Sequence, residues 1–271
     1  MMLGKMVHVG LCLGVLATAA PAIQLTAQDF EWNRQMDEGE TLVVRGISGD
    51  VRATLARGST AEVVATKSGR SSDFDKVRIE VFEERGETVI CVLYDSRRSD
   101  SDCENDRSDD DDGRRGRNIR VSVDFEVRVP SGVTFEGSTV SGDVEARDLR
   151  SDVEASTVSG SVDVSTTGVA RGSTVSGSVD VEMGSLDWRR LDFSTVSGDI
   201  TVSVPAGLDA EIDFESLSGD FDSDFSVDVE HLRDRFIGSE LRGTIGEGTR
   251  RMSFRTVSGD VELRRARREV R

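Results

Sequence analysis

The hydrophobic positions of this chain recur in a short alternating unit that favours β-strand. The unit reads TVSGSVDV at residues 157–164 and again at 174–181. Alternation of apolar and polar residues with a period of two is typical of a strand that buries one face. Val, Ile and Thr fit a pleated sheet, and the Ser-Gly pair permits a tight corner. Each copy is therefore predicted to form two short strands joined at a bend.

Related copies extend over the second half of the chain. They read TVSGDVEA, TVSGDITV, SLSGDFDS and TVSGDVEL at residues 139–146, 195–202, 216–223 and 256–263. The corner glycines are Gly142, Gly160, Gly177, Gly198, Gly219 and Gly259, spaced by 18, 17, 21, 21 and 40 residues. One copy cannot bury its valines alone, but copies stacked about 4.8 Å apart can. The predicted fold is all-β: a single-stranded β-solenoid, or parallel β-helix-like stack, of roughly 20-residue coils.

Two other all-β folds are less compatible with this repeat. A β-propeller blade needs about 40 residues and four strands, and an antiparallel sandwich gives no reason for near-identical eight-residue copies. The gap of 40 residues before the last glycine is about twice the others. We expect a degenerate turn within it, near residues 236–238 or 243–246.

Stacking predicts that equivalent residues of successive copies form columns. One inward column is expected from Val140, Val158, Val175, Val196, Leu217 and Val257. A second is expected from Val144, Val162, Val179, Ile200, Phe221 and Val261.

The first half of the chain is also rich in alternating segments. Residues 77–84, 87–94 and 119–130 are predicted strands, and Arg85-Gly86 between the first two reads as a hairpin turn. ISGDVRA at 47–53 is a variant of the repeat, so the stack is expected to begin there. The expected organisation is a signal peptide at 1–27, a β-rich N-terminal portion at 28–133 with an acidic loop at 95–118, solenoid repeats at 134–266, and a basic tail at 267–271.

The N-terminus has the layout of a secretory signal. Lys5 precedes an apolar stretch that ends in small residues, with Ala27 as the preferred cleavage point and Ala17 to Ala19 as the alternative. No later stretch is apolar enough to span a bilayer. The protein is therefore expected to be exported, to the periplasm or to the cell surface or beyond. In that oxidising setting Cys91 and Cys103 are expected to form a disulfide, the alternative being two free thiols.

Composition narrows the classes of function. The formal charge is −17, with 51 acidic and 34 basic residues, and such a surface disfavours nucleic acid and anionic lipid headgroups as partners. After the signal only one histidine remains, His231, so a Ser-His-Asp triad and a zinc site are poorly supplied. No phosphate-binding or dinucleotide-binding motif occurs. We expect no catalytic, cofactor or metal residues.

Calcium is the one cofactor for which the sequence gives a weak indication. Acidic residues follow several corner glycines, at Asp143, Asp199, Asp220 and Asp260, and stacking brings like charges close. Bound cations could bridge such layers, whereas solvent screening is the alternative. In the acidic loop, Asp110 and Asp112 resemble part of a calcium loop, but Ile119 occupies the place of the expected glutamate.

Two longer segments carry a family resemblance. These are VSVDFEVRVPSGVTFEGSTVSGDVEA at residues 121–146 and GTIGEGTRRMSFRTVSGDVELRR at 243–265. With the ordered series of repeats they resemble the bacterial putative-adhesin family of unknown function, built from β-strand repeats. The resemblance implies an extracytoplasmic β-solenoid and implies no tested activity.

Together these observations predict an exported, non-enzymatic β-solenoid that binds or scaffolds an envelope component, glycan or protein. Adhesion is one version of this role. The alternative is a carbohydrate-active enzyme on a parallel β-helix. An active site should interrupt the repeat, and the best candidate interruption is residues 222–242.

Overall fold

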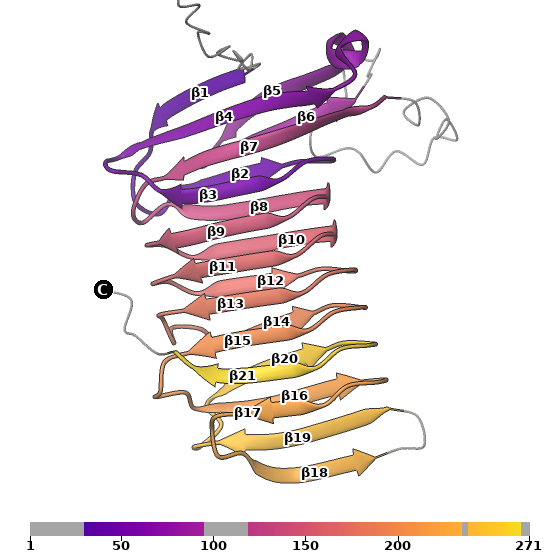
Figure 1. Cartoon of the computed structure of the whole chain (residues 1–271). Helices are drawn as coiled ribbons and strands as arrows, with labels where there is room; N and C mark the ends of the chain where they lie inside the picture. Colours follow the sequence, from indigo (N-terminus) through magenta and orange to yellow (C-terminus); the bar gives the residue numbers. More distant parts are fainter. Residues whose placement is uncertain (1–29, 95–118, 235–237, 267–271) are drawn as a thin grey trace, which may run out of the picture.

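The computed structural model describes residues 30–94, 119–234 and 238–266, which form two long β-sheets packed face to face (Figure 1). In spatial order sheet A contains β1 (Phe30–Gln35), β4 (Thr60–Gly69), β7 (Val121–Val129), β3 (Val51–Leu55), β9 (Val144–Leu149), β11 (Val162–Thr166), β13 (Val179–Met183), β15 (Ile200–Val204), β21 (Val261–Arg265) and β17 (Phe221–Ser223). Sheet B contains β18 (Asp228–Asp234), β19 (Ser239–Ile245), β16 (Ala210–Ser216), β20 (Arg250–Arg255), β14 (Arg190–Ser194), β12 (Ala170–Ser173), β10 (Val153–Ser159), β8 (Thr134–Ser141), β2 (Thr41–Arg45), β6 (Glu87–Tyr94) and β5 (Val77–Glu84). A short 3₁₀ helix, η1 (Ser71–Lys76), precedes β5.

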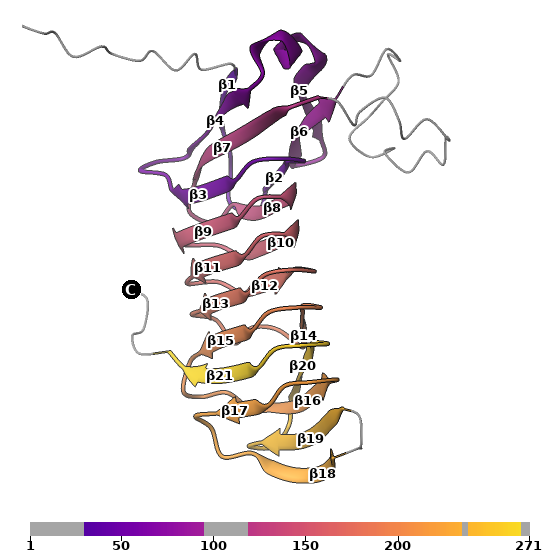
Figure 2. The ribbon, with the colours of Figure 1, turned by 45° about the vertical axis from the view of Figure 1, so that its right-hand side comes forward.

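Each coil of the stack consists of one strand from each sheet. The chain runs along β8 in sheet B, turns at Gly142, runs back along β9 in sheet A and then enters β10. Neighbouring coils pair in parallel and in register, with Asp163 of β11 beside Glu145 of β9. The predicted all-β solenoid is confirmed, and Figure 2 shows its layers from a second side.

The core is a single apolar layer between the two sheets. The second predicted column lies in it: Val144, Val162, Val179, Ile200 and Val261 are buried, and Phe221 is partly buried. In sheet B the inward position changes from Gly137 and Gly172 in early coils to Phe193 and Phe254 in later ones. The rings of Phe193 and Phe254 stack with centroids 5.7 Å apart. The space beside these glycines is filled by neighbouring side chains such as Val144 and Val179, whereas in later coils aromatic rings of sheet B fill the core.

The coils do not follow one another in chain order at the C-terminal end. β21, which comes last in the chain, lies between β15 and β17 in sheet A, and β20 lies between β14 and β16 in sheet B (Figure 1). The expectation of a degenerate parallel turn between Gly219 and Gly259 is wrong. That segment contains β18 and β19, which pair antiparallel with each other and cover the end of sheet B.

One carboxylate fixes the turn that leads from this hairpin back into the stack. Asp209 Oδ1 accepts hydrogen bonds from the backbone amides of Glu247, Gly248 and Thr249, and Oδ2 accepts one from the Thr249 hydroxyl. Burial raises the pKa of Asp209, but these hydrogen bonds to the charged form outweigh it and hold the pKa below its ordinary value. The turn is therefore built around an ionised aspartate.

The N-terminal end is capped by antiparallel strands in both sheets. In sheet A β4 pairs antiparallel with β7 and β1 pairs antiparallel with β4, and in sheet B β5 pairs antiparallel with β6. Arg85 and Gly86 both have positive φ, as a two-residue hairpin turn requires. ISGDVRA is part of the stack as predicted, because Ser48 bridges Ser141 and β3 pairs with β9.

Several predictions fall on residues without a structural description. The signal peptide, the acidic loop and the basic tail, at 1–27, 95–118 and 267–271, lie outside the described residues. Within the described ranges, no helix has the length and apolar character needed to cross a bilayer.

Candidate functional site

The corner glycines allow one coil to lie directly on the next. Gly142, Gly160, Gly177, Gly198 and Gly259 have φ between 141° and 151°, where side chains are rarely tolerated. A Cβ atom on Gly160 would lie 2.0 Å from the carbonyl oxygen of Gly142. Gly219 does not share the positive φ of the other corner glycines, so the corner geometry changes in the last layer of the stack.

The threonine three residues before each corner glycine lies inside the stack. The Oγ1 atoms of Thr157, Thr174 and Thr195 each donate a hydrogen bond to the corner-glycine carbonyl of the neighbouring coil, at 2.9–3.1 Å. Thr139 does the same to Gly49. These bonds link successive corners and satisfy hydroxyls that would otherwise be buried without a partner.

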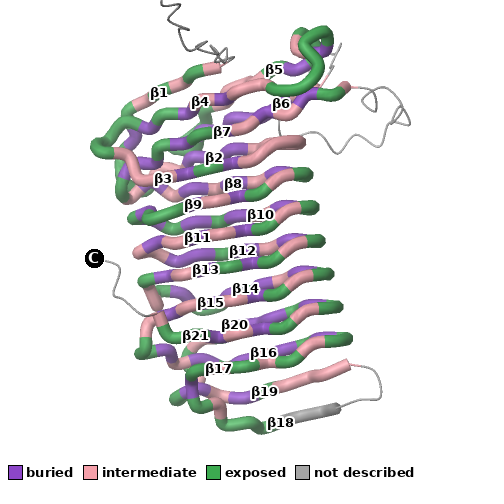
Figure 3. Tube along the Cα trace, in the orientation of Figure 1, coloured by how far each residue is buried: buried purple, intermediate pink, exposed green. Residues whose placement is uncertain are grey.

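The valine after each threonine faces solvent, contrary to the first predicted column. The residues concerned, in spatial order, are Val140, Val158, Val175, Val196, Val257 and Leu217, with exposed fractions of 43–53%. We call this set the aliphatic ladder. Before each corner the odd-numbered or even-numbered residues that point inward are not the same set as after it. Thr139 and Val144 therefore both point inward, and Val140 points outward. Figure 3 shows exposed positions along this edge, where the strands of sheet B end.

Aspartates after the corner glycines bond to the backbone of the next coil. Asp143 Oδ1 accepts a hydrogen bond from the Ser161 amide at 2.8 Å, and Asp199 and Asp260 accept from the Asp260 and Asp220 amides at 2.9 Å. In the described part of the chain, no group of three or more His, Cys, Asp or Glu side chains is placed to hold a metal ion. Calcium binding by the acidic loop concerns residues that the structure does not describe.

A second acidic column follows the outer face of sheet A. Glu145, Asp163 and Asp180 are neighbours in three successive strands. Arg147 forms ion pairs with Asp163 at 2.6 Å and with Glu145 at 3.6 Å. Burial first, and then the charge of Asp163, raise the pKa of Asp180 above its ordinary value. The charge of Asp163 therefore acts on Asp180 in the neighbouring strand.

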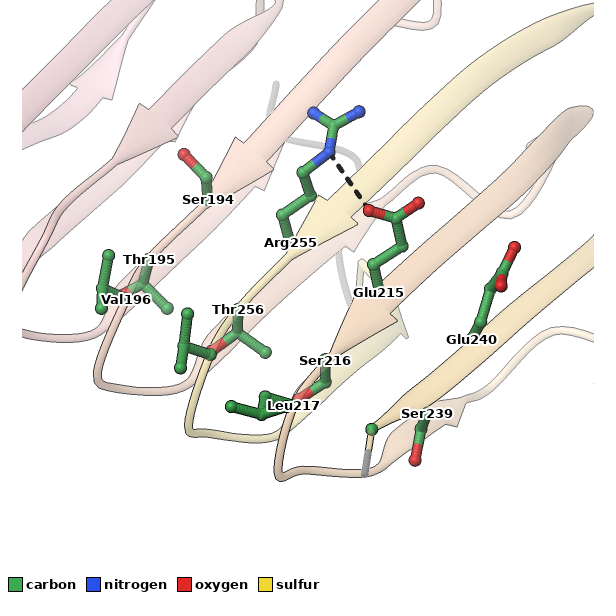
Figure 4. Close-up of a pocket in the computed structure, with 12 residues that line it drawn as sticks. Ser194, Thr195, Val196, Glu215, Ser216, Leu217, Ser239, Glu240, Arg255 and Thr256 are labelled. Carbon is green, nitrogen blue, oxygen red and sulfur yellow. Dashed lines mark ion pairs between the residues drawn. The ribbon is translucent and has the colours of Figure 1, made fainter. Parts of the chain in front are cut away.

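The aliphatic ladder ends in a groove near the edge of sheet B that β18 and β19 form. The groove has a volume of about 700 Å³ and lies at the corners that follow β14, β20 and β16, next to the start of β19 (Figure 4). Its rim contains three ladder residues, Val196, Val257 and Leu217. Glu215, Glu240 and Arg255 supply its charged groups, and the remaining lining residues are Ser194, Thr195, Ser216, Gly238, Ser239 and Thr256. On the side of β16 away from β20, the groove is bounded by the antiparallel β19, whose Ser239 pairs with Ser216.

The charged side chains of the groove form a small network. Glu215 and Glu240 are direct cross-strand partners in β16 and β19. Arg255 lies 3.7 Å from the Glu215 carboxylate and 3.6 Å from that of Asp192, as atom-to-atom distances, and Figure 4 shows the first of these pairs. Glu240 forms an ion pair with Arg242 at 3.3 Å. Two carboxylates and one guanidinium thus face the groove.

The sequence pointed to this region only through the interruption at 222–242, which supplies Gly238, Ser239 and Glu240. His231 lies in β18, and its side chain is outside the described residues. Cys91 is buried in β6 and is disulfide-bonded. Cys103 lies outside the described residues, so its pairing with Cys91 stays a prediction.

The stacked corners and repeated strands agree with a family comparison. Residues 131–264 match the family described as Toastrack DUF4097. This segment belongs to that toastrack family. The toastrack domain begins just before β8 and ends within β21, so it contains the aliphatic ladder and the groove. Among curated proteins, none matches the chain.

Solved structures similar to this chain include three bacterial proteins. A putative cell adhesion protein from Clostridium sporogenes has 9% identity and a TM-score of 0.42, covering 88% of this chain and 99% of its own. A putative adhesin from Bacteroides fragilis has 10% identity and a TM-score of 0.31, covering 86% and 96%. One from Parabacteroides merdae has 8% identity and a TM-score of 0.24, covering 86% and 95%. With TM-scores this low, these likenesses add nothing to what the chain itself shows.

Proposed function

We propose that this protein is an exported, non-enzymatic binding or scaffold protein of the cell envelope, and that it binds a partner along the aliphatic ladder. The observation that carries the proposal is the exposure of six aliphatic side chains in six successive layers. Contiguous exposed apolar surface is uncommon on soluble proteins and marks interaction sites. Threonine would supply the same β-propensity without exposing an extra methyl group, so strand formation alone does not explain the ladder.

The repeat makes this surface suitable for an extended partner. Equivalent side chains recur about every 4.8 Å, and each layer presents nearly the same contact. Many weak and equivalent contacts along one partner combine into a stable association. An adhesin-like role and an envelope scaffold both use such a surface.

Three features support export. The first 27 residues have the pattern of a secretory signal. Cys91 is disulfide-bonded, which suits an oxidising compartment. The charge of −17 favours solubility over attachment to nucleic acid or anionic lipid.

Localisation and ladder binding are tested in the same cells. Protease shaving of intact cells, followed by fractionation, separates surface exposure from a periplasmic location. In-cell crosslinking then compares the unaltered protein with a Val158→Thr and Val175→Thr double variant. The expected result is that the ladder variant keeps its melting temperature and loses its crosslinked partner.

Val229→Thr is the matched control, because Val229 is equally exposed, at 46%, and lies outside the ladder. Equal crosslinking by all three proteins would refute binding through the ladder. A cytoplasmic location of the protein would refute export.

A second candidate function rests on Glu215 and Glu240. Two neighbouring carboxylates in a groove are the minimal equipment of a glycoside hydrolase, and these two are cross-strand partners. Hydrolysis of an envelope glycan that is abolished by Glu215→Gln, in a protein that still folds, would support this function. No turnover on a broad glycan panel would count against it.

A further inference from the structure

The groove is the place where the hydrogen-bonding pattern of the corners is left incomplete. In the four preceding layers the corner threonine donates to a glycine carbonyl of the neighbouring coil. Thr256 Oγ1 and Ser216 Oγ occupy the equivalent positions, and neither has a hydrogen-bond partner. Thr256 is 6% exposed, Ser216 is 8% exposed, and both line the groove. A buried hydroxyl without a partner costs about 1–3 kcal/mol, so the hydrogen bonding between successive corners is incomplete in the two layers that border the groove.

The charges of the groove favour a cation. Its lining holds the carboxylates of Glu215 and Glu240 and the guanidinium of Arg255, which is shared with Asp192, while Arg242 pairs with Glu240 from outside the lining. The surrounding chain has a formal charge of −17. An anionic ligand would therefore meet an unfavourable field, whereas an ammonium group would be attracted to both carboxylates.

The rim of the groove favours a cation that is carried on an aliphatic stem. Val196, Val257 and Leu217 line it and are about half exposed, and Figure 4 shows Leu217 next to Ser216 at the corner that follows Glu215. A lysine side chain can lay its methylene groups on such a surface while its ammonium reaches the carboxylates. None of the lining residues is aromatic, so a sugar ring finds no flat face on which to stack.

We propose that this groove binds a lysine side chain of a protein partner whose extended segment lies along the aliphatic ladder. The proposal rests on the proposed function and names the chemistry of its partner. The ladder supplies repeated apolar contact, and the groove at its end fixes the register through one charged contact.

The test uses the full chain, isotope-labelled for NMR, and the synthetic peptide acetyl-Val-Thr-Lys-Thr-Val-amide. The matched peptide has norleucine in place of lysine, which keeps the aliphatic stem and removes the charge. The lysine peptide is expected to shift the amide signals of Leu217, Gly238, Ser239 and Thr256, and the norleucine peptide is expected to leave them in place. Shifts with both peptides would overturn the charged contact.

Variants separate a specific site from general attraction to an acidic protein. The Glu215→Gln and Glu240→Gln double variant is expected to weaken peptide binding about tenfold, because hydrogen bonds to charged groups are lost. Asp180→Asn with Glu182→Gln changes the net charge equally on β13 of sheet A, and it is expected to bind normally. Equal weakening by both double variants would overturn the proposal.

Ser239→Lys provides an independent variant at the groove itself. Its own lysine side chain is expected to occupy the site and to exclude the peptide, while the melting temperature stays unchanged. Normal peptide binding by this variant would overturn the proposal. If the peptide fails to bind but crosslinking in cells still depends on the ladder, the lysine site is refuted and the proposed function stands. Loss of ladder dependence as well would refute both.

Discussion

Substituting one corner glycine should destabilise the whole stack. In Gly160→Ala the new side chain is forced to φ of 151°, and an L residue in such a region costs about 1–3 kcal/mol. Its Cβ would also lie 2.0 Å from the carbonyl oxygen and 2.6 Å from the carbonyl carbon of Gly142. Those atoms are backbone in a paired layer and cannot rotate away, and overpacking typically costs about 1–3 kcal/mol. The expected total loss is about 2–6 kcal/mol, a large share of the usual stability of a domain.

Two control substitutions separate these costs. Gly58→Ala meets nothing within 4 Å and has no positive φ, so its free energy of unfolding should change by less than about 1 kcal/mol. Gly219→Ala has no positive φ, but its Cβ would lie 1.9 Å from the Gly259 carbonyl oxygen, so it should show the steric cost alone. Urea unfolding followed by circular dichroism gives each value from the midpoint and slope. A Gly160→Ala protein as stable as Gly58→Ala would refute the close approach of successive corners.

Three further substitutions test other parts of the structure. Val162→Ala, at a position 1% exposed, should lower the free energy of unfolding by about 1–3 kcal/mol. Val158→Ala, at a position 44% exposed, should lower it by less than about 0.5 kcal/mol. Equal losses of stability in thermal melts would contradict the assignment of Val162 to the inner face and Val158 to the outer face. The pKa of Asp180 is raised by burial and by Asp163, so the unfolded chain releases this proton at lower pH than the folded chain, and stability falls as pH rises through this range. Asp180→Asn should therefore raise stability at pH 7 by about 0.2–1 kcal/mol, and melts below about pH 4 should show no gain. The pKa of Asp209 is lowered in the fold, so its contribution to stability is present at neutral pH and is lost as pH falls through that pKa. Asp209→Asn should therefore lower the melting temperature at pH 7 and lower it much less in acid. A loss of melting temperature that is independent of pH would argue against an ionised Asp209.

The repeat made the fold predictable because each copy is locally consistent with it. Alternation in SVDV indicated a half-buried strand, and Val162 and its equivalents are buried as expected. The Ser-Gly pair indicated the corner, and Gly160 has the positive φ that only glycine adopts easily. What the pattern did not reveal is that parity changes at the corner. Extending the alternation from Val162 back through the glycine placed Val158 inside, where the structure has Thr157.

The order of the coils was not predictable from near-identical copies. TVSGDVEL at 256–263 would fit between any two layers, and a gap of 40 residues is compatible with an additional coil or with a hairpin excursion. The groove was missed for the same reason. Its lining comes from four separate segments that only the inserted layer brings together. The interruption at 222–242 was the one signal in the sequence that marked its position.

The position of β20 and β21 after the β18–β19 hairpin makes the interior of the stack depend on synthesis of residues 250–265. An ordinary solenoid can lose its last coil and keep the others. Here residues that follow the β18–β19 hairpin in the chain fill an interior layer, so a chain that stopped before residue 250 would leave β15 and β17 without the strand that joins them. The same inserted layer supplies Arg255, Thr256 and Val257 to the groove. A product that ended before residue 250 would therefore lack the groove, which forms only when the inserted layer is present.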